Sequence, residues 1–317
     1  MISSGIRSRL VVLFAFALPE LLPAQTLVPG TNAAPSEPPP PPRVVLLHDV
    51  VIGKGGDQDI HAEVAYPANI TKPVPGILCF HGGGWLYGKS KDYIPLITAL
   101  AHNGYFAASI DYRLSNVAKW PAEIQDCKLA VRWLRANAAQ YHVDPNRIVA
   151  WGGSAGGHLA ACLGTMADVK EYEGDGGYPG VSSAVQAVVD FYGPVDLSNP
   201  GDYSSSDYDM PKLIQSLFGV PFATNPDLWK SGSPLLYVKA GDPPMIIVHG
   251  DSDKAVPLAQ SVAFDAALTQ AGVPHQFIIV KNADHGFKPV PGATIDPSQA
   301  EIYHDVSVFL AKYIKGS

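Results

Sequence analysis

Ser154 and a run of glycines upstream of it are the residues with the clearest potential for chemistry. Ser154 lies in a Gly-x-Ser-x-Gly pattern at residues 152–156, and three glycines at 82–84 follow His81. The serine pattern is typical of a nucleophile elbow, a sharp strand-to-helix turn that raises a hydroxyl out of the backbone. Such a turn leaves little room for neighbouring Cβ atoms, which favours glycine on both sides. The upstream glycines leave backbone N–H groups free to stabilise the negative charge that the serine's attack creates.

Each of these patterns also has a simpler interpretation. A single Gly-x-Ser-x-Gly in a glycine-rich chain is compatible with a tight turn, and three glycines in a row with an ordinary loop. Here each pattern follows a short apolar run, at 147–151 and 76–80, that suits a buried parallel strand. The two together, in this order, therefore favour a catalytic serine with an oxyanion hole.

A serine nucleophile of this kind needs an acid and a base further along the chain, in the order Ser, Asp or Glu, His. The runs 244–249 and 276–280 read as strands, and the loops after them contain Asp251, Asp253 and His285. Functional groups gather beyond the carboxyl ends of strands in an open α/β sheet. We choose Asp253 as the acid, because Asp251 directly abuts the strand and is better placed to cap the turn.

Four other histidines near these segments have structural interpretations. His249 lies inside a predicted strand and reads as a satisfied core histidine, and His275 begins the next strand. His158 lies on the helix behind the serine. His81 is expected to hold the glycine loop by hydrogen bonding. None of these four is expected to act as the base.

The motifs together resemble α/β-hydrolase fold esterases of the hormone-sensitive-lipase-like group. The chain is especially similar to the compact secreted carboxylesterases that include feruloyl and acetylxylan esterases. The resemblance runs from about residue 44 to 313. It rests on HGGGW at 81–85, DYRL at 111–114, GGSAGGHLA at 152–160, FYGPVDL at 191–197, HGDSDKAVP at 249–257 and DHGF at 284–287.

The resemblance implies a catalytic triad of Ser154, Asp253 and His285. It also implies an oxyanion hole made by three backbone N–H groups, those of Gly83, Gly84 and Ala155. The chain departs from the larger enzymes of the group at its front end, where a proline-rich stretch stands in place of their helical cap. A lid over the acyl site is therefore not implied.

Alternating short apolar runs and helical patterns predict one α/β domain with a mostly parallel eight-stranded sheet flanked by helices. The first two strands, joined by a glycine-rich turn, are expected to form an antiparallel edge. The predicted strands are 45–52, 58–66, 75–80, 105–110, 147–151, 186–191, 244–249 and 275–281. The predicted helices are 91–103, 121–140, 154–165, 258–272 and 298–314.

The segment 196–242 does not fit the alternation. A structureless loop of that length is unusual in a compact domain, so we expect a small helical insertion near the active site. It is either surface decoration or a substrate-binding flap. Its aspartates Asp202, Asp207 and Asp209 match no calcium-loop spacing, and no metal site is expected.

Four aromatic residues near the motifs are candidates for walls of a substrate pocket, although aromatic residues are more often part of the core. They are Trp85, Tyr87, Tyr112 and Tyr192. The three cysteines, Cys79, Cys127 and Cys162, read as small core residues, since an odd count gives no disulfide framework. No cofactor is expected.

The N-terminus reads as an export signal. Arginines precede an apolar run at 10–18, and small residues follow, which predicts a signal peptide over 1–24. The run is short for a membrane span, although an uncleaved anchor is the alternative. A proline-rich linker over 25–43 then leads to the catalytic domain, 44–317. This predicts a secreted or periplasmic protein without a stable membrane anchor.

Composition and charge limit the function further. The chain has 317 residues, 47% hydrophobic content and a net charge of −7, with no basic cluster for nucleic acid. The prediction is a hydrolase that forms an acyl-enzyme with acetyl, short-chain or hydroxycinnamoyl esters, either small molecules or polysaccharide-linked. A prolyl-oligopeptidase-like peptidase is the alternative, and a catalytically silent binding protein is the third possibility. The oligomeric state is not predicted.

Overall fold

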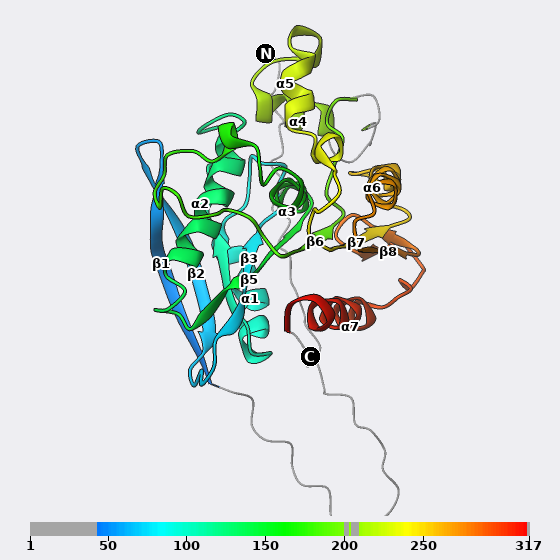
Figure 1. The fold of residues 1–317 in the computed structure, drawn as a ribbon. Helices are drawn as coiled ribbons and strands as arrows, with labels where there is room; N and C mark the ends of the chain where they lie inside the picture. The colour runs from blue at the N-terminus through cyan, green and yellow to red at the C-terminus, as the bar shows by residue number, and fades with distance from the viewer. Residues whose placement is uncertain (1–42, 200–202, 204–208, 316–317) are drawn as a thin grey trace, which may run out of the picture.

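An eight-stranded sheet forms the centre of the protein (Figure 1). The computed structural model describes residues 43–199, 203 and 209–315. The predicted signal peptide and all but the last residue of the predicted linker lie outside the described residues. The strands of the sheet are β1 (Val44–Gly55), β2 (Gln58–Pro67), β3 (Val74–Phe80), β4 (Phe106–Ile110), β5 (Val143–Gly153), β6 (Ala187–Phe191), β7 (Met245–Gly250) and β8 (His275–Val280).

The strand order is β1-β2-β4-β3-β5-β6-β7-β8. The pairs from β4 to β8 are parallel, whereas β1 pairs antiparallel with β2, and β2 with β4. This confirms the predicted mostly parallel sheet and its antiparallel edge. The strands β5, β7 and β8 end along one edge, and the loops that follow them carry Ser154, Asp253 and His285.

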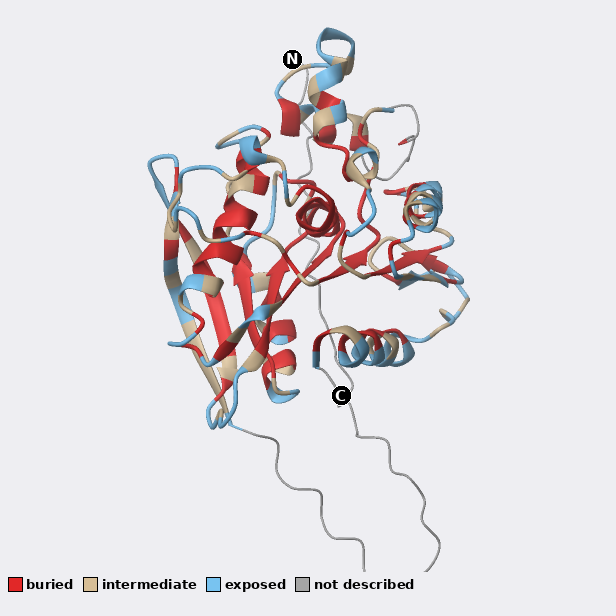
Figure 2. Cartoon of the chain, viewed as in Figure 1, coloured by how far each residue is buried: buried red, intermediate tan, exposed pale blue. Residues whose placement is uncertain are grey.

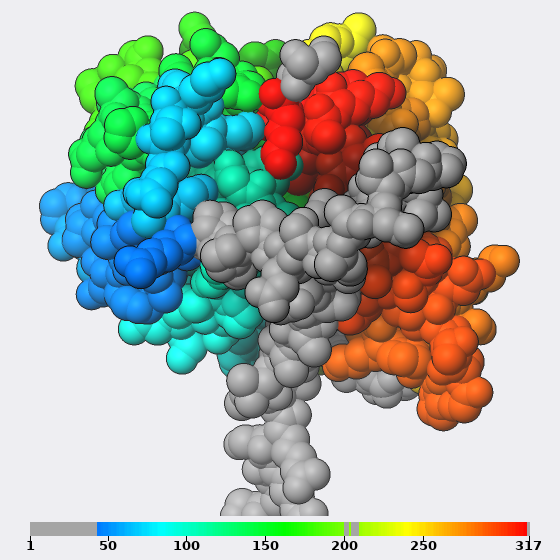
Figure 3. All heavy atoms as spheres, turned by 90° about the horizontal axis from the view of Figure 1, so that it is seen from below, coloured from blue at the N-terminus to red at the C-terminus, as the bar shows by residue number. Residues whose placement is uncertain are grey.

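Helices cover both faces of the sheet (Figure 1). The helices α2 (Ala122–Ala136), α3 (Ala155–Thr165) and α6 (Leu258–Ala271) lie on one face, and α1 (Ile94–His102) and α7 (Gln299–Leu310) on the other. Seen from below, α7 forms part of the molecular surface (Figure 3). The predicted helix 121–140 ends earlier, at Ala136, and the prediction 298–314 joins α7 to a π-helical turn, η6 (Ala311–Lys315). Four short elements lie in the connections along the chain: η1 (Ser90–Tyr93), η2 (Lys170–Tyr172), β9 (Ala283–Asp284) and β10 (Lys288–Pro289).

The central strands are buried on both sides (Figure 2). Nearly every residue of β3, β4, β6 and β7 is buried, as the continuous apolar runs of a doubly covered parallel sheet require. Cys79, Cys127 and Cys162 are all buried with free thiols, and burial raises the pKa of each thiol. They are therefore unreactive core residues, as the sequence predicted.

The described part of the insertion between β6 and β7 contains four short helices, which confirms the prediction of a helical insertion. It contains α4 (Met210–Phe218), η4 (Phe222–Thr224), α5 (Pro226–Ser231) and η5 (Pro234–Tyr237), with α4 and α5 at the top of Figure 1. The buried side chains of α4 recur at helical spacing, at Met210, Ile214, Leu217 and Phe218. This apolar face holds the insertion against the domain.

Of the three aspartates that could have suggested a calcium site, the structure describes one. Asp202 and Asp207 lie outside the described residues. Asp209 is the N-cap of α4, and its side chain accepts a hydrogen bond from the backbone N–H of Lys212. An aspartate at this position satisfies one of the unpaired N–H groups at the start of a helix.

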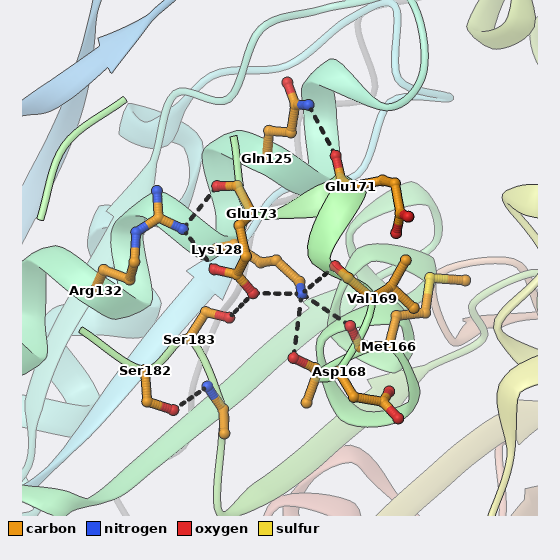
Figure 4. Close-up of polar contacts among 12 residues, drawn as sticks. Gln125, Lys128, Arg132, Met166, Asp168, Val169, Glu171, Glu173, Ser182 and Ser183 are labelled. Carbon is orange, nitrogen blue, oxygen red and sulfur yellow. Dashed lines mark hydrogen bonds and ion pairs between the residues drawn. The ribbon is translucent and has the colours of Figure 1, made fainter. Parts of the chain in front are cut away.

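A buried ionic network fixes the far end of the helix that follows Ser154 (Figure 4). The Lys128 ammonium on α2 has a fully buried side chain and donates to the Met166 carbonyl and to the Glu173 carboxylate, both at 2.8 Å. Arg132 donates to the same carboxylate at 2.9 Å. Met166 is the C-cap of α3. The network therefore ties α2 to the C-terminal end of α3.

Candidate active site

Ser154 stands at the turn between β5 and α3 with a backbone φ of 56°, a conformation that non-glycine residues rarely adopt. The turn depends on two close backbone approaches. A Cβ at Gly152 would lie 2.0 Å from the Gly156 carbonyl oxygen, and a Cβ at Gly156 would lie 1.9 Å from that of Phe80. This confirms the reason for glycine on both sides of the serine. The residue itself is 8% exposed.

The structure brings Ser154, His285 and Asp253 together from three separate loops. His285 Nε2 lies 2.9 Å from Ser154 Oγ, and His285 Nδ1 lies 2.7 Å from Asp253 Oδ2. Because a carboxylate only accepts, Nδ1 carries the proton and Nε2 is free to accept from the serine hydroxyl. This is the hydrogen-bond order that proton transfer from a serine requires.

Asp253 is held as an anion. Its side chain is fully buried, and Oδ1 accepts from the backbone N–H groups of Ala255 and Val256, both at 2.8 Å. Burial alone would raise the pKa of Asp253, but hydrogen bonds from His249 and His285 outweigh it and hold that pKa well below its usual range. Asp251, the other carboxylate weighed from the sequence, instead accepts from the Ser252 hydroxyl at 2.9 Å.

A small hairpin presents His285. The strands β9 and β10 pair across the turn that contains it. The Asp284 carboxylate accepts from the backbone N–H of His285 at 2.7 Å and from that of Lys254 at 3.0 Å. This carboxylate therefore joins the loop of the acid to the loop of the base.

The glycine loop lies against the serine turn. A Cβ at Gly82 would be only 3.3 Å from the Cβ of Ser154. Gly83 and Gly84 have φ values of 120° and 58°, and the Gly83 carbonyl accepts from the N–H of Tyr87 at 3.0 Å. Ala155 is the first residue of α3, where N–H groups have no carbonyl partner within the helix. The glycine loop and the start of α3 thus both adjoin Ser154.

His81 has the supporting place expected of it. Its Nδ1 lies 2.8 Å from the Gly82 carbonyl, and its own carbonyl accepts from the Tyr112 hydroxyl at 2.8 Å. The two rings stack with their centroids 4.3 Å apart. Burial lowers the pKa of His81, so the ring is neutral and donates to the loop through Nδ1.

His158 connects the glycine loop to the insertion, which sequence reasoning missed. The Trp85 indole N–H donates to His158 Nδ1 at 3.2 Å, and His158 Nε2 lies 2.7 Å from the Gly232 carbonyl. Burial lowers the pKa of His158 to about 4, so the ring is neutral with its proton on Nε2. No local pattern around Gly232 indicates this contact, because Gly232 belongs to the insertion and lies 74 residues from His158.

The four aromatic residues proposed as pocket walls differ in exposure. Trp85, Tyr112 and Tyr192 are 0%, 2% and 3% exposed, and Tyr87 is 49% exposed. The Tyr192 ring packs edge-on against His285 with centroids 4.8 Å apart. Tyr87 is therefore the one that offers a substantial surface to a ligand, whereas each of the other three packs against a histidine near the site.

Two further observations concern ligands and membranes. Among the described residues, no group of three or more His, Cys, Asp or Glu side chains is arranged to hold a metal ion. Within the same ranges, no helix is both long enough and apolar enough to cross a bilayer.

The chain is similar to known proteins both in sequence and in structure. The BD-FAE family model matches residues 62–268. Esterase LipQ of Mycobacterium tuberculosis (strain ATCC 25618 / H37Rv) is 37% identical over 242 residues, which cover 75% of this chain and 56% of LipQ. A truncated form of a carbohydrate esterase from gut microbiota has a TM-score of 0.73 at 29% identity, covering 86% of this chain and 97% of that one.

The esterase Est2 of the Planctomycetes species Thermogutta terrifontis is a further structural relative. It has a TM-score of 0.68 at 31% identity, covering 86% of this chain and 92% of Est2. The chain spans about half the length of the curated relatives it matches, with 56% of LipQ and 59% of esterase LipC covered.

Proposed function

The chain belongs to the BD-FAE family and has the α/β-hydrolase fold, and on this basis we propose that it is a serine carboxylic-ester hydrolase. The observation that carries the proposal is the continuous hydrogen-bonded series from Ser154 through His285 to Asp253, at 2.9 and 2.7 Å. LipQ, LipC and the two structural relatives reported above bear the names of esterases.

The reaction that fits this geometry proceeds through an acyl-enzyme. His285 Nε2 takes the proton of the Ser154 hydroxyl as its oxygen attacks the ester carbonyl carbon. Asp253 keeps the imidazole in the required tautomer and stabilises its charged form. The protonated imidazole then gives its proton to the leaving alcohol. In the second half of the reaction, His285 takes a proton from water as the water oxygen attacks the acyl carbon, and the proton passes to Ser154 Oγ as the acid leaves.

The oxyanion of the tetrahedral intermediate is assigned to the N–H groups of Gly83, Gly84 and Ala155. Removal of one such donor typically costs on the order of 3 kcal/mol of transition-state stabilisation. The assignment is supported by the contact of the glycine loop with the serine turn and by the place of Ala155 at the start of α3.

We assign the enzyme to short acyl groups, including acetyl and hydroxycinnamoyl groups on small or polysaccharide-linked alcohols. Two solved structures of the Thermogutta esterase are described as propionate bound and butyrate bound, and another relative is a carbohydrate esterase. Leu213 of α4 lies against Gly84, since a Cβ there would be 2.7 Å from Leu213 Cδ1. The insertion thus lies against the glycine loop, which supports a flap role for 196–242 and a limited acyl pocket.

A substrate panel tests the proposal. We expect kcat/KM for nitrophenyl esters to fall as the acyl chain lengthens beyond roughly eight carbons, because each methylene contributes about 0.8 kcal/mol only while the pocket can bury it. Methyl ferulate and acetylated xylan test the hydroxycinnamoyl and polysaccharide assignments. A maximum at palmitate would contradict the short-acyl assignment. Cleavage of a proline-containing peptide amide without ester cleavage would identify a peptidase instead, and no turnover of any substrate would indicate a silent binding protein.

A sequence-based expectation of export accompanies this proposal. We propose that residues 1–24 direct the protein out of the cytoplasm and that 25–43 act as a spacer. An extracellular or periplasmic place would suit esters carried on polysaccharides. N-terminal sequencing of the protein purified from its native host tests this, since a mature chain that still begins at Met1 would contradict it.

A further inference from the structure

His249 has a second partner besides those of an ordinary core histidine. It is the penultimate residue of β7 and is fully buried, in keeping with its interpretation from the sequence. Its Nε2 lies 3.3 Å from Oδ2 of Asp253, the oxygen that also accepts from His285. A second imidazole therefore contacts the carboxylate oxygen that accepts from the base.

The surroundings of His249 determine which nitrogen carries the proton. Its Nε2 lies 2.8 Å from the Val256 carbonyl as well as 3.3 Å from the Asp253 carboxylate, and both oxygens can only accept. Its Nδ1 lies 2.7 Å from Ser261 Oγ on α6. A proton on Nε2 satisfies both of these acceptors, and the Ser261 hydroxyl orients the ring through Nδ1.

With this proton on His249 Nε2, both oxygens of the Asp253 carboxylate have N–H groups facing them. Two backbone N–H groups, of Ala255 and Val256, donate to Oδ1. His285 Nδ1 and His249 Nε2 both face Oδ2. Rotation of the carboxylate would break several of these contacts at once. Because the side chain is fully buried, water could not replace them.

We propose that His249 is a positioning residue for the proposed triad, which holds Oδ2 of Asp253 toward His285 and takes up part of its negative charge. Ser261 in turn orients His249, so the first turn of α6 supports the acid through one intermediate side chain. The neighbouring Gln260 accepts from the N–H groups of Val195 and Asp196, which ties the same turn to the start of the insertion. The inference rests on the proposed function.

The test compares two replacements of His249. His249→Phe removes the N–H, whereas His249→Gln can place an amide N–H near the position of Nε2. We expect His249→Phe to lower kcat on nitrophenyl acetate by about ten- to hundredfold with KM nearly unchanged, as loss of a supporting contact does elsewhere. The glutamine variant should recover most of that loss. Leu268→Ala, which removes a buried apolar side chain from α6, the helix that carries Ser261, is the control for destabilisation alone and should keep kcat.

A second readout does not depend on the substrate. Without the His249 N–H, more negative charge on Asp253 faces His285, so protonation of the base becomes easier. The midpoint of the His285 titration, followed by ¹⁵N NMR, should therefore move to higher pH by about half a unit in His249→Phe, and the acid limb of kcat/KM should follow it. Ester turnover that is absent even in the wild type would count against the proposed function alone, since the NMR titration would still test the role of His249.

Several results would overturn the inference. They are a folded His249→Phe that keeps more than a third of the wild-type kcat, a His285 titration that does not move, or a glutamine variant no better than the phenylalanine one. If His249→Phe does not fold, Ser261→Ala takes its place. It should move the titration in the same direction by a smaller amount, and an unchanged titration in that variant would equally contradict the proposal.

Discussion

The two sides of Ser154 are built from different kinds of interaction. On the side of β7 and β8, side chains are linked in series from Ser261 through His249 and Asp253 to His285. On the side of β3, the serine turn is contacted by the backbone of a glycine loop, whose N–H groups we propose as oxyanion donors. That loop is held by neutral rings, with Trp85 donating to His158 and Tyr112 stacked on His81.

This difference separates two ways of preparing a site for charge. The β7–β8 side manages a proton, so it needs a buried carboxylate, which is costly to bury unless every lone pair is satisfied. In the proposed reaction the β3 side receives a transient negative charge without carrying a permanent one, and fixed backbone dipoles do this with little reorganisation. We therefore expect the first side to be sensitive to side-chain chemistry and the second to backbone fit.

The largest effect should come from removing the atom that both sides serve. Ser154→Ala should leave the fold intact and lower ester turnover by about a millionfold, because the proton-handling side then has nothing to act on. The residual rate, roughly a thousandfold or more above the uncatalysed reaction, would measure what the oxyanion side contributes alone. The measurement is kcat on nitrophenyl acetate with a circular dichroism check of folding. Retention of more than a tenth of the wild-type kcat would contradict the assignment of the nucleophile.

Asp253→Asn should have the next largest effect. The asparagine carbonyl would keep the N–H donors of Ala255 and Val256, which turns the amide NH₂ toward His285 Nδ1. That forces the imidazole proton onto Nε2, and a protonated Nε2 cannot accept the proton of Ser154. We therefore expect kcat to fall about ten thousandfold.

Asp251→Asn provides the matched control for this change. Asp251 lies in the same loop, but its described side-chain contact is the neighbouring Ser252 hydroxyl. We expect it to change kcat less than tenfold. If the Asp251 variant proves the more damaging of the two, the acid has been assigned to the wrong carboxylate.

Much of the proton-handling side could be predicted from the sequence, because its residues follow buried strands in a recognisable order. Strand ends at 249 and 280 were predicted within one residue of β7 and β8, which places Asp253 and His285 at one edge. The contact of His249 with Asp253 could not be predicted, since it depends on how the turn after β7 folds back. A histidine near the carboxyl end of a parallel strand is the signal that could have suggested it.

On the β3 side, the backbone turns at the glycine loop and at Ser154 could be predicted, but the side-chain contacts that hold the glycine loop could not. The glycines and the elbow carry short-range patterns, and the steric reason for Gly152 and Gly156 is confirmed. The support of Trp85 runs through His158 to Gly232, a contact between two segments with no shared pattern. Burial of Trp85 likewise could not be judged, because a tryptophan after a glycine loop reads equally well as pocket wall or as core.

The backbone character of the second side can be tested with two glycines. Gly83→Ala would place a Cβ 2.3 Å from the Tyr87 carbonyl oxygen, so the loop must move and its N–H donors with it. We expect kcat to fall by about a hundred- to a thousandfold, as for loss of one oxyanion donor. Gly104→Ala also replaces a glycine of positive φ, 83°, but no atom would lie within 4 Å of its Cβ. It should therefore show the conformational strain without the kinetic loss.

The neutrality of the second side predicts a pH dependence of stability. The pKa of His158 is about 4 in the folded protein and 6.5 in an unfolded chain, so the unfolded state binds more protons between these values. Stability is therefore lost as pH falls from 6.5 towards 4, and His158 should account for about 2 kcal/mol of the loss between pH 7 and 5.

Urea unfolding of the wild type and of His158→Gln at both pH values measures this contribution. Asp190 titrates in the same range, because burial raises its pKa to about 6, but it is present in both proteins and cancels in the difference. Equal pH dependence in the two proteins would mean that His158 is not the neutral link described above.

The smallest effect should come from Tyr87→Ala, which separates the role of the Tyr87 side chain from that of its backbone N–H. Its N–H donates to the Gly83 carbonyl, a contact that Tyr87→Ala retains, whereas the residue is 49% exposed and its side chain can cover a bound substrate. Covering part of that ring gives at most about 2 kcal/mol. We therefore expect kcat/KM to fall a few-fold for methyl ferulate and hardly at all for nitrophenyl acetate. Val308→Ala, an exposed apolar residue on α7, is the control and should affect neither. An equal loss on both esters would mean that Tyr87 acts through the glycine loop, and the ring would then belong to the support of the oxyanion side.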